Sequence, residues 1–146
     1  MALFQSFNIS ASGMTAERFR TDIIAENIAN VNTTRTASGE PYRRKIVTFA
    51  EKQVTPFSQY YSHSKNAVVG NGVKVSKVTE DYENDFVMEY DPANPDADEN
   101  GYVAYPNVNT VTEMTNLIDA TRAYEANTTA FEASKKLAET GLTIGR

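Results

Sequence analysis

The sequence predicts an α+β protein in which long N- and C-terminal helices form a coiled-coil-like pair, with a small β-rich segment between them. Apolar residues recur at helical spacing near both termini, and apolar and polar residues alternate in parts of the middle. Gly, Pro, Asn and Asp clusters separate these two kinds of pattern. We therefore divide the chain into residues 1–34, residues 35–109 and residues 110–146.

The first helix is expected over residues 3–29, with apolar residues on two faces. At about 100° per residue, one face holds Leu3, Phe4, Phe7, Ala11, Met14, Ala25 and Ile28, and a roughly opposite face holds Ile9, Ala16, Phe19 and Ile23. A helix with two apolar faces needs two neighbours. Gly13 costs about 1 kcal/mol inside a helix, so it marks either a kink or the close approach of another backbone. The Asn and Thr residues at 30–34 should end the helix.

The middle segment should contain short strands joined by polar loops. Strands are predicted over residues 45–49, 73–78 and 86–90, of which the second alternates strictly between apolar and polar residues. Residues 35–44, 56–66 and 91–109 should be loops, because they are rich in Ser, Pro, Asn, Asp and Gly.

The last helix should begin at a capping box formed by Thr110 and Glu113 and end near Thr140, with Gly141 as the stop. It would be roughly 45 Å long, which is more than one small domain can cover. Its apolar residues again form two stripes. One stripe holds Leu117, Tyr124, Phe131 and Ala138, and the other holds Ala123, Ala126, Ala130, Ala133 and Leu137. Long helices with two stripes, one of them lined with alanine, favour packing in a helical assembly.

Composition excludes several classes of function. A net charge of −5 and a pI of about 4.9 argue against nucleic-acid binding. The chain has no cysteine, no membrane-length apolar run and no secretory signal pattern at its start. Charge is uneven, because residues 80–99 hold nine acidic side chains and no Lys or Arg, whereas residues 43–45 form a basic triplet. These charges are either solvated or form a contact between neighbouring subunits.

No arrangement of residues predicts catalysis. The single histidine, His63, lies in a polar loop, and the chain has neither a catalytic Cys nor a phosphate-binding glycine motif. Residues 96–101 match the first half of an EF-hand calcium loop, but Asn107 stands where the closing Glu belongs. The alternative is a turn in which Asp and Asn side chains bond to local backbone. We expect no enzyme activity, cofactor, metal or small-molecule substrate.

Several motifs resemble bacterial flagellar axial proteins, the rod, hook and hook-associated family. The N-terminal motif is AENIANVNT at residues 25–33, and the most telling stretches are YDP at 90–92 and PDADENGYVAYPNVN at 95–109. PYRRK at 41–45 and YEAN at 124–127 extend the resemblance to nearly the whole chain. Distal rod and hook relatives are longer, so a length of 146 residues fits the proximal rod type.

The resemblance implies a structural subunit of the flagellar basal-body rod, stacked helically through its terminal helices to transmit torque. It also implies export through the flagellar type III apparatus to a site outside the cytoplasmic membrane. The implied partners are copies of this chain, other rod proteins and the junction between the rod and the membrane rings, with no nucleic acid. The expected subunit-interface residues are Leu3, Phe7, Met14, Phe19, Ile23, Asn27, Asn30, Asn32, Leu117, Tyr124, Phe131 and Leu137. The Asn side chains would cap the first helix or bond to an adjacent subunit.

The alternative function is a soluble helical adaptor. Its acidic loop at residues 96–101 would bind a partner, with calcium as a possible ligand. An adaptor would be a well-folded monomer or dimer in isolation, whereas a rod subunit would need its neighbours to cover the second stripe of each helix.

Overall fold

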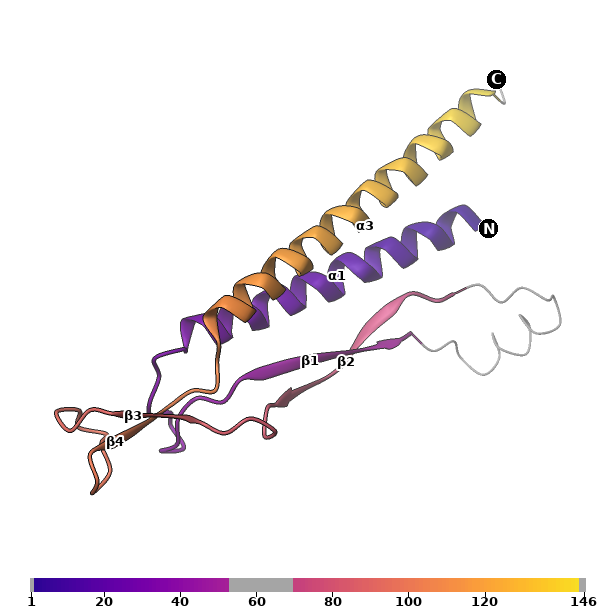
Figure 1. Ribbon diagram of the computed structural model, residues 1–146. Coiled ribbons are helices and arrows are strands. Elements are labelled where there is room, and N and C mark those ends of the chain that lie inside the picture. Colours follow the sequence, from indigo (N-terminus) through magenta and orange to yellow (C-terminus); the bar gives the residue numbers. More distant parts are fainter. Residues whose placement is uncertain (1, 53–69, 145–146) are drawn as a thin grey trace. The chain divides into compact units, whose positions relative to one another are not determined.

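The computed structural model describes residues 2–52 and 70–144, with side chains described from residue 4 onward. In chain order the elements are α1 (Ala2–Ala29), β1 (Lys45–Glu51), β2 (Val73–Glu80), β3 (Val87–Tyr90), β4 (Tyr102–Tyr105) and α3 (Thr110–Ile144) (Figure 1). This order confirms the α+β class, with long terminal helices and a small β middle. The predicted loop at residues 56–66 and His63 lie outside the described residues.

Internal contacts group the chain into two compact units, and each long helix contributes to both. The first unit comprises Met1–Phe19, Phe49–Ser76 and Ala120–Arg146, and the second comprises Arg20–Thr48 and Lys77–Asp119. None of the helices in the described ranges carries an apolar stretch long enough to cross a membrane.

Helix α1 ends where the sequence predicts. The backbone N–H of Asn30 still bonds to the carbonyl of Glu26, and the Asn30 side-chain amide donates to the same carbonyl at 2.9 Å. The Thr33 hydroxyl then donates to Asn30 Oδ1 at 3.2 Å. The Asn30 side chain thus bonds to the last turn of the helix, but the Glu26 carbonyl already has a backbone partner, so Asn30 does not cap an otherwise unpaired group.

The strands form two separate two-stranded sheets, β1–β2 and β3–β4. In the first sheet, Asp81 N–H bonds to Arg44 O at 2.8 Å and Lys52 N–H bonds to Gly72 O at 2.9 Å, so the strands are antiparallel. Strand β4 lies inside the stretch 91–109 that was predicted to be loop, and this prediction was wrong. The stretch is rich in turn-forming residues, so its pattern predicts a loop. It nevertheless contains a strand of four residues, β4, which pairs antiparallel with β3 and buries Val103.

Helix α3 begins at the predicted residue with a different cap. Asn109 Oδ1 accepts bonds from the N–H groups of Val111 and Thr112 at 3.0 and 3.1 Å, which makes Asn109 the N-cap. The predicted capping box is wrong because the Glu113 carboxylate is bound elsewhere. The helix also passes through Gly141 to Ile144, because that glycine remains in the helical conformation instead of ending the helix.

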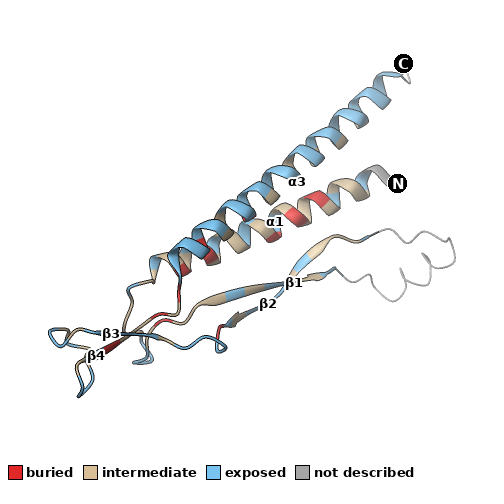
Figure 2. Ribbon diagram, in the orientation of Figure 1, coloured by how far each residue is buried: buried red, intermediate tan, exposed pale blue. Residues whose placement is uncertain are grey.

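Few residues are buried within the described ranges (Figure 2). Among the described residues, the buried hydrophobic ones are Ala16, Ile24, Tyr42, Val103, Val108 and Ala120, and the buried polar ones are Ser10, Asn27, Asp81 and Glu113. Of the three largest fully buried side chains in the part of the chain that the structure describes, two, Glu113 and Asn27, are polar. The fold therefore depends on specific hydrogen bonds as well as on apolar burial.

Candidate functional site

Within the first unit, some of the predicted interface residues contact each other inside the chain. The Phe7 and Phe131 rings pack at 4.9 Å between centroids with a 58° tilt, a favourable aromatic geometry. The Thr128 hydroxyl donates to Met14 Sδ at 3.3 Å. These contacts join α1 to α3, so the stripe containing Phe131 provides the intrachain pairing of the helices.

The other stripe of α3 remains largely open. Ala126, Ala130 and Ala133 are exposed, and Leu137 is 70% exposed. Only Ala123 at the start of this stripe is half-buried. One face of α3 therefore packs within the chain while a second apolar face reaches solvent.

The remaining predicted interface residues have mixed environments. Phe19, Tyr124 and Asn32 are exposed, while Ile23, Asn30 and Leu117 are half-buried. The side chain of Leu3 is outside the described part of the structure.

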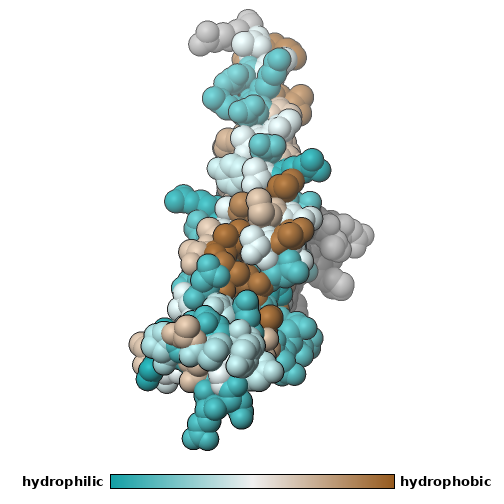
Figure 3. All heavy atoms as spheres, turned by 60° about the vertical axis from the view of Figure 1, so that its left-hand side comes forward, coloured by the Kyte–Doolittle hydropathy of each residue, from teal (hydrophilic) through white to brown (hydrophobic). Residues whose placement is uncertain are grey.

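A third apolar group on α3 was not among the predicted residues. Val111, Met114 and Ile118 are 75%, 55% and 52% exposed. Their spacing of three and four residues places them on one helix face. The spacing of these three residues is present in the sequence, but the predicted interface followed the heptad that contains Leu117, which lies on a different side of the helix. Leu142 and Ile144 are further exposed residues near the end of α3, and Figure 3 shows hydrophobic side chains reaching the surface among polar ones.

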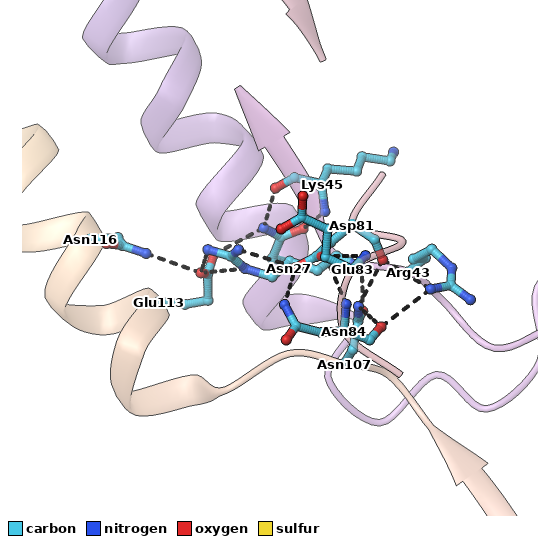
Figure 4. Close-up of polar contacts among 10 residues, drawn as sticks. Asn27, Arg43, Lys45, Asp81, Glu83, Asn84, Asn107, Glu113 and Asn116 are labelled. Atoms are coloured by element: carbon cyan, nitrogen blue, oxygen red, sulfur yellow. Dashed lines mark hydrogen bonds and ion pairs between the residues drawn. The ribbon is translucent and has the colours of Figure 1, made fainter. Parts of the chain in front are cut away.

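Asn27 lies at the centre of a buried polar network in the second unit (Figure 4). Its side-chain N–H donates to Lys45 O and to Glu113 Oε2, both at 2.9 Å. Its Oδ1 accepts from the Lys45 backbone N–H and from the Tyr42 hydroxyl, again at 2.9 Å. Asn27 thus links α1, β1 and α3, and its polar atoms bond within the chain instead of capping the helix.

Glu113 is 1% exposed, and its carboxylate forms an ion pair with the guanidinium of Arg44. Arg44 donates to Glu113 Oε1 through Nε at 3.0 Å and Nη2 at 2.7 Å, and Asn116 donates to the same oxygen at 3.2 Å. Arg44 Nη1 also lies 3.6 Å from Asp81 Oδ2. A buried carboxylate needs such partners, because an unpaired charge is costly away from water.

Burial and hydrogen bonds shift the pKa values of two ionisable groups in this network, Asp81 and Tyr42. Hydrogen bonding from the Asn84 side chain is the largest cause that lowers the pKa of Asp81, and backbone N–H groups and Arg44 act in the same direction. Burial raises the pKa of Tyr42 to about 12, with nearby Glu26 and Glu113 adding to the effect. The Tyr42 hydroxyl therefore stays protonated and can donate to Asn27.

The basic triplet at residues 43–45 is used inside the chain. Arg43 donates to the carbonyls of Asp81 and Asn84, and its guanidinium lies over the rings of Tyr82 and Phe86. Arg44 binds Glu113 as described, and Lys45 pairs with Glu26. The triplet was expected either to be solvated or to contact a neighbouring subunit. Its three side chains instead bond to residues of the same chain.

The acidic loop forms turns stabilised by its own side chains. Asp98 Oδ1 accepts from the backbone N–H groups of Asn100 and Tyr102 at 2.9 and 2.8 Å. Asp96 accepts from the Thr34 hydroxyl at 2.8 Å and lies 3.6 Å from the Arg35 guanidinium. Gly101 has φ of 81°, as a tight turn requires. These bonds match the turn interpretation of the EF-hand-like sequence.

Family comparisons match both ends of the chain. A model described as "Flagella basal body rod protein" matches residues 7–35, and one described as "Flagellar basal body rod FlgEFG protein C-terminal" matches residues 99–144. The matched regions include most of α1, strand β4 and the whole of α3.

Three curated relatives match over at least 98% of both chains, and each is described as a flagellar basal-body rod protein FlgC. The relative from Bacillus subtilis (strain 168) is 47% identical over 100% of both chains. The relative from Borreliella burgdorferi is 42% identical over 99% of this chain and 98% of its own, and that from Escherichia coli O157:H7 is 38% identical over 100% of both.

Proposed function

Because this chain belongs to the FlgC family of flagellar basal-body rod proteins, we propose that it is the proximal-rod subunit and packs helically on its neighbours through α1 and α3. It is a structural component of the basal body.

The observation that carries this proposal is the open apolar surface of α3. One face of α3 packs against Phe7 and Met14 of α1. Elsewhere the helix exposes Ile118, Leu137 and Leu142. At about 25 cal/mol per Å² of apolar area, covering these side chains with neighbouring subunits would favour assembly.

Torque transmission follows from the number and distribution of such contacts. A shaft that rotates without unwinding needs many simultaneous contacts between each subunit and its neighbours. Exposed apolar residues occur from Val111 to Ile144, along the full length of α3. We propose that the neighbours are copies of this chain and other rod proteins, reached after export through the flagellar type III apparatus, and that the chain has no catalytic role.

The test is Ile118→Asp in cells whose own copy of the chain has been replaced. An Asp in a covered apolar contact would be buried without a partner, so we expect loss of rods and of swimming. Ala37→Asp in an exposed turn is the matched control and should assemble normally. Normal rods with Ile118→Asp, seen by electron microscopy of isolated basal bodies, would contradict the proposed interface.

A further inference from the structure

Asparagine is followed by glycine at two places in the sequence, Asn71–Gly72 in the first unit and Asn100–Gly101 in the second. This pair is chemically labile. The backbone nitrogen of the glycine can attack the side-chain amide carbon of the asparagine, and glycine has no Cβ to obstruct the approach. The two pairs are equivalent by this sequence rule, but their hydrogen bonds in the folded chain are different.

The backbone nitrogen of Gly101 is held in a tight turn. Its N–H donates to the carbonyl of Asp98 at 3.0 Å, and the Asn100 N–H donates to Asp98 Oδ1 at 2.9 Å. Asp98 also bonds to the backbone N–H and carbonyl of Tyr102, both at 2.8 Å. To attack Asn100, the Gly101 nitrogen must give up its bond to Asp98. The turn therefore protects Asn100, although the Asn100 side chain is exposed.

The backbone nitrogen of Gly72 has no comparable bond. Within the described ranges, no backbone carbonyl accepts its N–H. The groups on either side of it are fixed instead. The Gly72 carbonyl accepts from the Lys52 N–H at 2.9 Å, and the Val73 N–H donates to Ser12 Oγ at 3.1 Å. The nitrogen that would attack Asn71 can therefore react without first breaking a backbone hydrogen bond.

Asn71 lies between two glycines, and the fold requires the second one. Gly72 has φ of 85°, and a Cβ there would lie 2.2 Å from Ser12 Oγ. A larger residue after Asn71 would hinder the attack, but it cannot fit against α1. At Gly70, a Cβ would meet no atom within 4 Å, so nothing crowds the chain before Asn71. The contact between α1 and the start of β2 thus keeps Asn71 in a reactive setting.

We propose that Asn71 is a deamidation site in the folded chain and that Asn100 is protected. The Gly72 nitrogen loses its proton to base and attacks Cγ of Asn71. The side-chain nitrogen takes up a proton and leaves as ammonia, and a five-membered succinimide remains. Water then adds to one of the two ring carbonyls, and the ring opens to aspartate or isoaspartate. Water is the only reactant besides the chain.

The product alters the contact between α1 and β2. Isoaspartate adds one atom to the main chain before Gly72 and introduces a carboxylate. The added atom displaces Gly72 and Val73 from the partners that they have in the folded chain, Lys52 and Ser12. We therefore expect deamidation at Asn71 to destabilise the first unit.

Peptide mapping by mass spectrometry tests the site. The purified full-length chain is incubated at mildly alkaline pH, and deamidation of both asparagines is followed over time. We expect Asn71 to react faster than Asn100 by roughly two- to tenfold, as one net hydrogen bond to the attacking nitrogen predicts. The matched control is the same chain unfolded in urea, in which both asparagines should react at similar rates.

The other outcomes of this experiment overturn the proposal. Deamidation of Asn100 in the folded chain that is as fast as that of Asn71, or faster, would show that the turn does not protect it. An equal preference for Asn71 in urea would assign the difference to the local sequence and not to the hydrogen bonds.

A second measurement concerns the effect on stability. Asn71→Gln is the matched variant, because glutamine would have to form a larger ring and reacts far more slowly. Incubation should lower the thermal denaturation midpoint of the unchanged chain and of Asn100→Gln, but not that of Asn71→Gln. An equal decrease in Asn71→Gln would overturn the effect assigned to deamidation at Asn71.

Discussion

The side-chain amide of Asn27 donates a hydrogen bond to the carboxylate of Glu113 at 2.9 Å, although the residues are 86 positions apart in the sequence. The bond joins the end of α1 to the first turn of α3. Both side chains are 1% exposed, and Arg44 supplies the balancing charge at 2.7 Å. The second unit is thus held together at its centre by a polar contact that requires all three residues.

Replacing Glu113 should strongly destabilise the second unit. Glu113→Gln leaves Arg44 without its closest carboxylate in a largely buried setting, and losing one partner of such a pair costs about 3–5 kcal/mol. Urea denaturation of the purified chain measures this as a lower transition midpoint. Glu99→Gln, in an exposed turn, is the control, and an equal midpoint for both variants would contradict the central role of Glu113.

Asn27→Asp should be more harmful than its small change in size suggests. The new carboxylate would lose the N–H donor that bonds to Lys45 O and would face Glu113 with like charge. We expect a loss of at least about 1–3 kcal/mol in the free energy of unfolding, the cost of unsatisfied buried polar groups.

The control for this variant is Asn32→Asp, which makes the same chemical change at an exposed position just beyond α1. It should unfold like the unchanged chain. An Asn27→Asp midpoint in thermal denaturation that is no lower than that of Asn32→Asp would contradict the role of Asn27 in the network.

The helices could be predicted from the sequence because their apolar repeat continues over many turns and Asn and Thr residues stand at the end of α1 and the start of α3. Residues 3–29 were expected as helix and Ala2–Ala29 is observed, and the start of α3 at Thr110 was predicted correctly. Strand β4 was missed because its partner, β3, is itself four residues long and lies across a loop. So short a pairing leaves little periodic pattern to recognise.

The internal polar network could not be predicted, because its bonds are between residues far apart in the sequence. Asn27 looked like a helix cap and Glu113 like part of a capping box, since local rules assign such residues to nearby backbone. Tertiary contacts with Arg44 and Lys45 override those local bonds. The basic triplet was misread for the same reason, whereas the bond from the Asn30 side chain to the Glu26 carbonyl is local, as a capping interpretation assumes.

Acid should weaken the second unit through Asp81. Its pKa is lowered in the folded chain, chiefly by the Asn84 side chain, so folding favours the ionised carboxylate. The stability that it contributes is complete above the ordinary carboxyl pKa of 3.8 and is lost as the pH falls below that value through the lowered folded-state pKa.

Asp81→Asn should therefore reduce the dependence of stability on pH in this acidic range, while lowering stability at neutral pH. Denaturation midpoints measured from pH 6 down to about pH 2 would show a flatter profile for the variant. Asp85→Asn, at an exposed position four residues along the chain, is the control. A profile as steep in Asp81→Asn as in the unchanged chain would assign the acid sensitivity to other groups.

Two glycines in the long helices should respond in opposite ways to the same substitution. A Cβ at position 13 would lie 2.6 Å from Asn127 Oδ1, whose side chain is held by a 2.8 Å bond to the Ala123 carbonyl. Gly13→Ala should therefore push α1 and α3 apart in the first unit and outweigh the gain in helix propensity. At Gly141 no neighbouring atom lies within 4 Å, so Gly141→Ala should gain up to about 1 kcal/mol.

Circular dichroism during thermal denaturation compares these variants directly. We expect a lower midpoint for Gly13→Ala and an equal or higher one for Gly141→Ala. If both variants raised the midpoint, helix propensity alone would govern these positions, and the close approach of Asn127 to Gly13 would not constrain the helix pair. Opposite shifts would show that Gly13 is required because an α3 side chain occupies the space that a Cβ would need.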